Sequence, residues 1–492
     1  MTTHIAKALL KDDVLLLVAE SHNVARFISF SPSLELRHFV LRDIPNKRST
    51  HESHPSVAVA TPQPSLLRDQ ADVRPIDQAR HAIAALFRAS KSGLINVRSF
   101  MPERPKGCPL KLGIATVDGA ISEISRLSEQ GYFTILNESI DIHDGGVSGV
   151  VLGGVAEFAP DATPRCVDNP DVASLPVKAA EKILTIVYGF GVRFGFDPTT
   201  RVEFSVHPER QGTRHEHIVI WEMSEDSDTP AEPVIDWPHA FSRHIGDKAF
   251  GLLVADYLGL IVPRTTVLCR KLKPFTFGTN TGLDRVWLRT APASNTPGKF
   301  TTVRGWHDPF RIMTNDDPEN TVVSSVLIQE EVPAKYSGGL STTSGDKPRI
   351  EGRKGFGDRF MLGIEERGDL PETVERALRV LHTKMLALLG SVSAEWVFDG
   401  NQPWVVQLHR EESPSIDDTI YSGDAVDYDN YDARRGLEEL RELIRIRSQD
   451  PPGAIKGICL IGDVGITSHF GQLLKDARIP SRRVKAQIGL FE

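Results

Sequence analysis

The chain has 492 residues, which is too long for one ordinary domain and predicts two or three. Its composition, 40% hydrophobic and 25% charged, is that of a soluble globular protein, and its net charge of −8 gives no general attraction to nucleic acid or to an anionic membrane. No apolar run approaches the roughly 20 residues that cross a bilayer, and the N-terminus is charged, so we expect a cytoplasmic protein.

The four cysteines, Cys108, Cys166, Cys269 and Cys459, show no metal-ligand spacing. They predict isolated reduced thiols rather than a zinc site or a disulfide framework.

The first 78 residues divide into two parts. Residues 1–45 contain two short apolar runs, VLLLVA and ARFISF, typical of buried strands or of a helix and a strand. Residues 46–78 are polar and proline-rich and predict a linker or a long surface loop. A helical period over Ile76–Ser90 then leads into a β-type segment at Ile95–Phe100.

Two acidic runs, Ser224–Pro238 and Ser413–Asp432, are typical of segments between domains. We therefore expect separate parts at 79–223, 239–412 and 433–492. The second run has no hydrophobic period and predicts a flexible connector before a helix near residues 433–449.

The parts at 79–223 and 239–412 repeat one order of elements: a strand with an arginine, a strand ending in Asn-Glu or Gln-Glu, a Ser-Gly turn, a helix, and a strand with a glutamate. Arg98, Asn137, Glu138 and Glu203 hold these positions in the first copy. This copy is either a degenerate one kept for architecture or a second ligand surface. His207, His215 and His217 lie close together in the sequence, and we interpret them as surface residues of a long hairpin loop rather than as a metal cluster.

The segment Ser393–Arg410 predicts a β-hairpin with its turn at Asp399-Gly400. A hairpin centred on Asn401 places Glu395 opposite Gln407, and Ser393 opposite His409, all on one face. A carboxylate and an amide oxygen on opposed strands can reach one magnesium ion. The alternative is that Glu395 lies on a solvated sheet face.

Four motifs in order resemble the nucleotide-binding domain of the pyruvate phosphate dikinase and phosphoenolpyruvate synthase family. They are IGDKAFGLLVADYLGLIVP (Ile245–Pro263), VWLRTAP, VLIQEEVPAKYSGGL and SAEW…VQLHR. The resemblance implies an α+β fold with an ATP-grasp-like two-lobed nucleotide-binding domain, preceded here by a partial, diverged copy of the same domain.

The resemblance implies roles for particular residues. Lys248 and Arg289 would hold ATP phosphates and act in catalysis, and Glu395 and Gln407 would hold Mg²⁺. Adenine would bind along the strand formed by Gln329, Glu330, Glu331 and Val332. Two positions depart from the family: Ser393 replaces an aspartate, and His409 replaces a nucleotide-binding arginine unless Arg410 serves instead. These departures imply reduced or altered activity.

The segment GITSHFGQLLKDARIP (Gly465–Pro480) resembles the phosphohistidine segment of the same family. The resemblance makes His469 the residue that carries phosphate, ahead of a helix that would aim backbone N–H groups at it. The alternative for His469 is a capping or surface residue.

We therefore predict an ATP-dependent phosphotransferase of dikinase type that passes phosphate from Mg-ATP through His469 to an unidentified acceptor. A partner protein or a second copy of the chain is left open. One alternative is a catalytically diverged, nucleotide-binding regulatory or scaffold protein. Another is an ATP-grasp ligase, in which His469 has no role.

Overall fold

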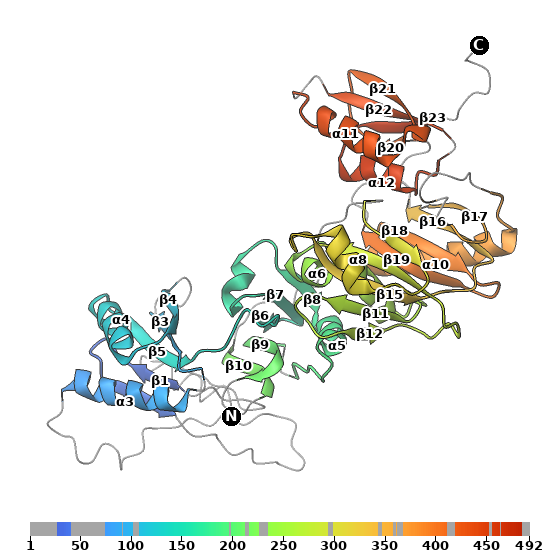
Figure 1. Ribbon diagram of the computed structural model, residues 1–492. Helices are drawn as coiled ribbons and strands as arrows, with labels where there is room; N and C mark the ends of the chain where they lie inside the picture. Colours follow the sequence, from blue (N-terminus) through green and yellow to red (C-terminus); the bar gives the residue numbers. More distant parts are fainter. Residues whose placement is uncertain are drawn as a thin grey trace. The chain divides into compact units, whose positions relative to one another are not determined.

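The structure, a computed structural model, describes fourteen parts of the chain (Figure 1): residues 27–40, 74–90, 92–101, 108–195, 198–211, 216–225, 235–293, 299–342, 347–357, 361, 368–410, 419–451, 455–462 and 464–484. The VLLLVA run and most of the proline-rich linker lie outside these residues. Two compact units are formed, one by residues 1–181 with 192–233 and the other by residues 182–191 with 234–492.

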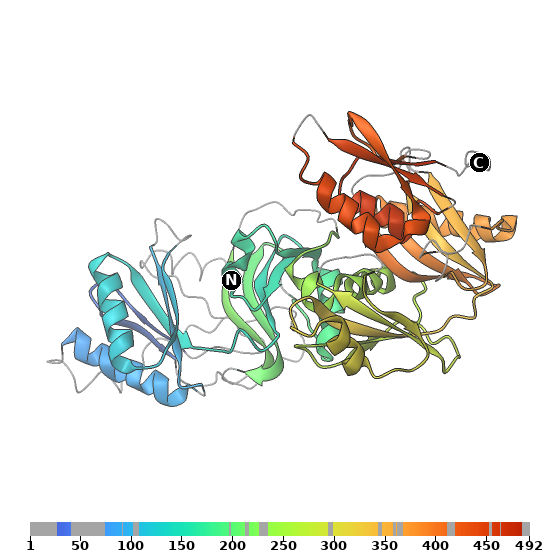
Figure 2. The ribbon, with the colours of Figure 1, turned by 45° about the horizontal axis from the view of Figure 1, so that its top comes forward.

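The first sheet of the first unit has the strand order β2-β1-β5-β3-β4. Two helices pack on one face of it and lie side by side (Figure 2). The elements are β1 (Phe27–Phe30), β2 (Leu36–Val40), α3 (Pro75–Ala89), β3 (Ile95–Phe100), β4 (Leu110–Ile114), α4 (Val117–Glu129) and β5 (Phe133–Glu138). Ile83 and Leu86 of α3 and Ile124 of α4 are fully buried, so each helix buries one apolar stripe against the sheet.

The second sheet of the first unit has the order β10-β9-β6-β7-β8. Its elements are β6 (Val147–Leu152), β7 (Val155–Pro160), the 3-10 helix η1 (Pro164–Asp168), β8 (Ala173–Pro176), β9 (Thr200–Gln211) and β10 (Glu216–Glu225). Helix α5 (Val177–Tyr188) begins in this unit, and its residues from 182 on belong to the second unit. The helix and the glutamate-bearing strand that the repeat predicts for the first copy therefore form as α5 and β9.

The second unit contains two facing lobes. Its first sheet has the order β12-β11-β15-β13-β14 and its second the order β17-β16-β18-β19. The elements are α6 (Ala240–Ile245), α7 (Asp247–Tyr257), β11 (Thr265–Cys269), β12 (Phe275–Phe277), β13 (Val286–Pro292), β14 (Thr302–Arg304), α8 (Pro309–Asp316), β15 (Val323–Glu330), β16 (Tyr336–Thr342), β17 (Pro348–Lys354), α10 (Glu372–Leu389), β18 (Val392–Phe398) and β19 (Pro403–Arg410).

The strand orders confirm the predicted duplication. The first sheets follow the same order of elements, and their registers agree as well. Ile95 pairs with Glu138 as Val286 pairs with Glu330, each three residues before the arginine of its strand.

The predicted Ser-Gly turn was wrong, because Ser148-Gly149 and Ser337-Gly338 lie inside strands β6 and β16. The second sheets still agree, since in both copies a glutamate pairs with the residue two positions after that serine. Glu203 pairs with Val150, and Glu395 pairs with Gly339. The two copies therefore share a residue-by-residue correspondence that sequence identity alone does not reveal.

The C-terminal part of the second unit has a small sheet of order β20-β23-β22-β21. Its elements are β20 (Thr419–Tyr421), β21 (Asp427–Asp432), the 3-10 helix η2 (Ala433–Arg435), α11 (Leu437–Arg447), β22 (Lys456–Ile461), α12 (His469–Asp476) and β23 (Ser481–Val484). The prediction of a flexible connector over the acidic run was wrong for its described residues, which supply two of the four strands. Tyr431 in β21 is fully buried and anchors that strand in the core.

None of the helices in the described ranges is long and apolar enough to cross a membrane. None of the four cysteines forms a disulfide in the described residues.

Candidate functional site

A cavity of about 270 Å³ lies between the two lobes of the second unit. It gathers most of the site residues predicted from the sequence: Lys248, Arg289, Gln329, Glu330, Val332, Glu395, Gln407 and His469. Glu331 and His409 are not among its lining residues. The cavity thus brings together residues that are up to 221 positions apart in the sequence, from Lys248 to His469.

Lys248 is placed by a break between two helices. Gly246 separates α6 from α7 with φ +92°, and a Cβ there would lie 2.6 Å from the Ala291 Cβ, so the position requires glycine. Asp247 is held by the Ser242 hydroxyl, which donates to its Oδ1 at 2.6 Å. Lys248 follows in the first turn of α7 and lines the cavity.

The predicted hairpin forms with the predicted register, and Glu395 pairs with Gln407 and Ser393 with His409. A bulge follows Glu395, and this shifts the pairing by one residue toward the turn. The carboxylate and the amide therefore lie opposite each other at the cavity, as a magnesium site needs.

Arg289 reaches across from the other lobe. Its Nη1 donates to Glu395 Oε2 at 3.2 Å and lies 3.5 Å from Gln407 Oε1. Its Nε is buried and has no hydrogen-bond partner in the described part of the chain. A buried donor of this kind is costly to leave unsatisfied, and an anionic oxygen in the cavity would satisfy it.

Burial and neighbouring charge shift the titration of the site. Burial, assisted by Arg289, lowers the pKa of Lys248 to about 8. Burial works to raise the pKa of the Glu395 carboxyl, but Arg289 and other nearby basic groups hold it below its ordinary value. Burial also lowers the pKa of His469 and of His409 to about 4, so both imidazoles are neutral at pH 7.

His409 has a different place from the one predicted. It contacts the Gln407 amide, whose Nε2 donates to the imidazole Nε2, an arrangement that fits a neutral histidine. Its effect on the site is therefore exerted through Gln407, because its side chain does not line the cavity.

The predicted adenine-binding strand has most of its N–H groups in use. The backbone N–H of Glu330 donates to Arg264 O and that of Glu331 to Arg285 O, both at 2.8 Å. The Gln329 amide is buried. Val332 follows Glu331, is also buried and lines the cavity.

Glu331 is engaged in ion pairs. Its carboxylate is bound by Arg304 at 2.5 and 2.9 Å and by Arg285 at 3.2 Å. Its side chain therefore fixes β14 and the start of β13 rather than contributing to the cavity surface.

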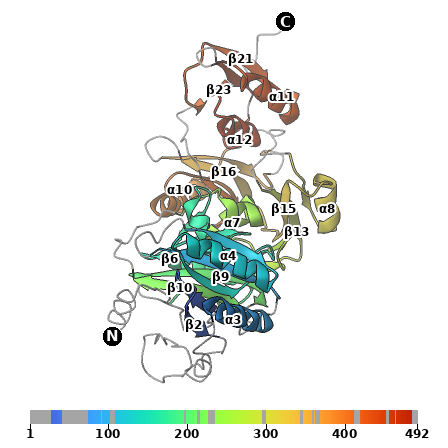
Figure 3. The ribbon, with the colours of Figure 1, turned by 90° about the vertical axis from the view of Figure 1, so that its left-hand side faces the viewer.

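His469 reaches the cavity because the C-terminal part contacts the second lobe next to β16 (Figure 3). Glu351 of β17 accepts hydrogen bonds from the Thr467 N–H at 3.0 Å and its hydroxyl at 2.9 Å, and it forms an ion pair with Arg483 at 3.1 Å. All three residues are buried. Sequence reasoning did not find Glu351, since a single glutamate in a strand carries no recognisable pattern.

Two further features surround His469. It is the first residue of α12, whose N-cap is Ser468, and the Ser468 hydroxyl is buried without a hydrogen-bond partner in the described residues. A cavity-lining imidazole therefore stands at a helix N-terminus, a position that favours a bound anion.

The histidine-rich hairpin of the first unit forms no metal cluster in the described residues. His207 is buried, contrary to the prediction of a surface position, and contacts Ser205 Oγ at 2.6 Å and Asp144 at 3.0 Å. His215 lies outside the described residues.

Neither a known protein family nor a curated protein matches the sequence. Several solved structures resemble parts of it. D-alanine-D-alanine ligase from Helicobacter pylori matches 35% of this chain with 14% identity and a TM-score of 0.24. The RimK domain ATP-grasp protein from Sphaerobacter thermophilus matches 34% with 18% identity and a TM-score of 0.22. L-amino acid ligase from Bacillus licheniformis matches 37% with 12% identity and a TM-score of 0.23.

The matched segments span 52%, 58% and 46% of those three proteins, about half of each. The predicted α+β fold class is borne out by the helices and the separate sheets of both units. The resemblance to the dikinase family stays a prediction, and similarity at this level carries nothing about the reaction.

Proposed function

We propose that the second unit is an ATP-dependent phosphotransferase in which His469 receives phosphate from Mg-ATP and passes it to a further acceptor. The observation that carries the proposal is the presence of His469 in one cavity with Lys248, Arg289 and Glu395. A ligase that forms an acyl phosphate on a bound carboxylate would leave this histidine without a role.

The residues of the cavity fit a nucleotide. Lys248 and the unpartnered Arg289 Nε suit phosphate oxygens, and the Val332 backbone suits the adenine edge. Glu395 and Gln407 would hold Mg²⁺, an ion that commonly takes one or two protein oxygens and completes its shell with water and phosphate. When bound, the ion would neutralise phosphate charge.

The proposed transfer uses the neutral form of His469. A lone pair of the imidazole attacks phosphorus, a P–N bond forms, and the P–O bond to the departing nucleotide breaks. Arg289 and Lys248 stabilise the charge on the phosphoryl oxygens. The phosphoimidazole then gives its phosphoryl group to the acceptor, and the neutral imidazole is restored.

The Arg289–Glu395 ion pair favours a second candidate, a nucleotide-binding protein that has lost catalysis. The first copy has the same pair at the corresponding positions, Arg98 to Glu203 at 2.7 Å. If both pairs only join two lobes, nucleotide binding would serve regulation or architecture.

Incubation of the full chain with magnesium and phosphate-labelled ATP separates these functions. Acid-labile label retained on the denatured protein is the result expected for phosphotransfer through histidine. Binding of ATP without retained label would support the regulatory candidate. If label passes directly from ATP to an added carboxylate substrate, and no labelled protein forms, the result would support a ligase.

A further inference from the structure

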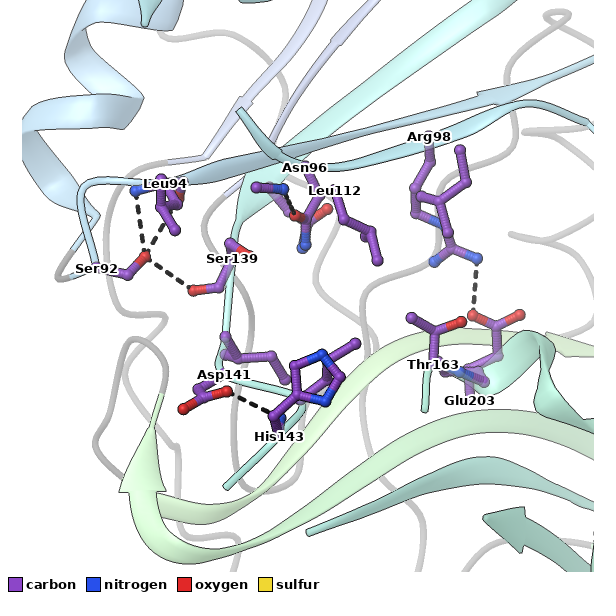
Figure 4. A pocket seen from close by; sticks show the side chains of 16 residues that line it. Ser92, Leu94, Asn96, Arg98, Leu112, Ser139, Asp141, His143, Thr163 and Glu203 are labelled. Atoms are coloured by element: carbon purple, nitrogen blue, oxygen red, sulfur yellow. Dashed lines mark hydrogen bonds and ion pairs between the residues drawn. The ribbon is translucent and has the colours of Figure 1, made fainter. Parts of the chain in front are cut away.

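A larger cavity, of about 570 Å³, lies between the two sheets of the first unit. Arg98 and Glu203 line it, as Arg289 and Glu395 line the candidate site of the second unit. It therefore occupies the corresponding place in the first copy. Figure 4 shows Asn96, Leu112 and Arg98 reaching into it from one sheet and Thr163 and Glu203 from the other side.

The charges in this cavity neutralise one another. Glu203 accepts from Arg98 at 2.7 Å through one carboxylate oxygen and from Arg201 at 3.1 Å through the other. Both oxygens of the position that corresponds to the proposed magnesium ligand are therefore occupied. This arrangement suits neither a metal ion nor a polyphosphate.

The remaining walls are mainly apolar. The apolar part is formed by Leu94, Leu110, Leu112, Ile140, Ile142 and Pro164, and polar side chains, among them Ser139, Asp141 and His143, complete the lining. A cavity of this volume and lining is typical of sites for small organic molecules, in which a few polar groups fix the orientation of the ligand.

Asn137 supplies such a polar group. It is 5% exposed, its Nδ2 donates to Glu138 O at 3.0 Å, and its Oδ1 is buried with no hydrogen-bond partner in the described residues. The bond to Glu138 O fixes which end of the amide is the donor, because the reverse assignment would oppose two oxygens. In the second copy the corresponding Gln329 donates through Nε2 to Thr265 Oγ1 and Val406 O, and none of its atoms is among the buried side-chain atoms that lack a partner in the described residues.

We propose that the first copy is a second small-molecule site, which binds an uncharged, flat heteroaromatic molecule of nucleoside size with an exocyclic amino group. The apolar side chains of β4, of the segments beside β3 and β5, and of η1 would enclose the ring, and the amino group would donate to Asn137 Oδ1. Binding requires a rotation about χ2 that turns Oδ1 toward the ring and weakens the bond from Nδ2 to Glu138 O. This proposal is independent of the activity of the second unit.

The test is ligand-observed NMR on the full chain, with a non-hydrolysable ATP analogue and magnesium present to fill the other site. The probes are adenosine, inosine, which has a carbonyl in place of the amino group, and purine riboside, which has only hydrogen there. We expect adenosine to bind about tenfold or more tightly than either analogue, because only adenosine supplies the missing donor.

Two matched variants locate the site. Asn137→Leu should weaken adenosine binding about tenfold, whereas Thr134→Val, at a buried position of the same strand β5 that is not among the lining residues, should leave it unchanged. Leu112→Trp, at a wall residue that is 41% exposed, tests occupancy by filling the cavity without touching the buried amide and should also abolish binding. Circular dichroism verifies that each variant is folded.

The proposal is overturned if adenosine binds the wild type no better than purine riboside, or if it shows no binding. It is also overturned if Asn137→Leu and Leu112→Trp both keep the adenosine signal, because adenosine would then bind another part of the chain.

Discussion

Replacement of Lys248 by methionine is predicted to stabilise the protein while it weakens nucleotide binding. The ammonium group is held in a buried position beside Arg289, and its pKa falls from 10.5 to about 8. At about 1.36 kcal/mol for each pKa unit, this difference corresponds to about 3 kcal/mol. Methionine has a similar length without the charge and can occupy the same space.

The sign of the effect follows from linkage. Below pH 8 the lysine is charged in both the folded and the unfolded protein, so the cost of burying the charge is fully present. Between about pH 8 and 10.5 the folded protein releases its proton first, and the cost disappears. The advantage of Lys248→Met should therefore be largest at neutral pH and approach zero near pH 10.5.

Thermal unfolding of the full chain in the absence of nucleotide measures this advantage. At pH 7 the transition that involves the second unit should rise by about 6–12 °C, and the affinity for Mg-ATP should fall at least about tenfold. Lys354→Met, at an exposed strand position, is the matched control and should change stability by less than about 0.5 kcal/mol. A variant that is less stable than wild type at pH 7, or equally stabilised at pH 7 and 10.5, would refute the reasoning.

Three further substitutions test the contacts that place the site. Gly339→Val should displace the C-terminal part, because a Cβ at this position would lie 2.4 Å from the Thr467 Oγ1. Hydrogen exchange should therefore accelerate in residues 464–484. It should not accelerate in β16, because the first copy has Val150 at the corresponding position of its sheet. Glu351→Gln leaves the buried Arg483 without its charged partner and should weaken the same contact by about 3 kcal/mol, also measured by hydrogen exchange; unchanged protection would show that the ion pair contributes nothing. Glu203→Gln should flatten the acid limb of the curve of stability against pH. The arginines hold the pKa of the Glu203 carboxyl below 4.5 against the effect of burial, so the wild type has this stability above about pH 4.5 and loses it as the pH falls through the folded pKa. Parallel curves for the two proteins would contradict the assignment.

Much of the second unit could be predicted because its signals are local. The hairpin follows from the Asp399-Gly400 turn, and the observed pairs of Glu395 and Ser393 are the predicted ones, although the bulge after Glu395 shifts the pairs nearer the turn by one residue. The repeat was found from element order because each copy keeps an arginine and a glutamate at fixed strand positions.

The remaining features depend on contacts between distant segments. The run Asp427–Asp432 shows no apolar pattern, yet it forms β21 because it is an edge strand that buries Tyr431 and leaves its other side chains mostly accessible. The role of Glu351 could not be predicted because it depends on contacts with Thr467 and Arg483, which are distant from it in the sequence. Likewise, the unpartnered oxygen of Asn137 is a property of its surroundings and leaves no trace in the sequence.

The most direct test of the proposed function is to locate the phosphate after incubation with Mg-ATP. Phosphopeptide mapping under alkaline conditions would compare the wild type with His469→Ala and with His409→Ala, a matched control at a second half-buried, neutral histidine outside the cavity lining. The account predicts acid-labile label on the peptide that contains His469, absent in His469→Ala and retained at reduced yield in His409→Ala. Label that persists in His469→Ala, or ATP binding with no label on any peptide, would contradict it.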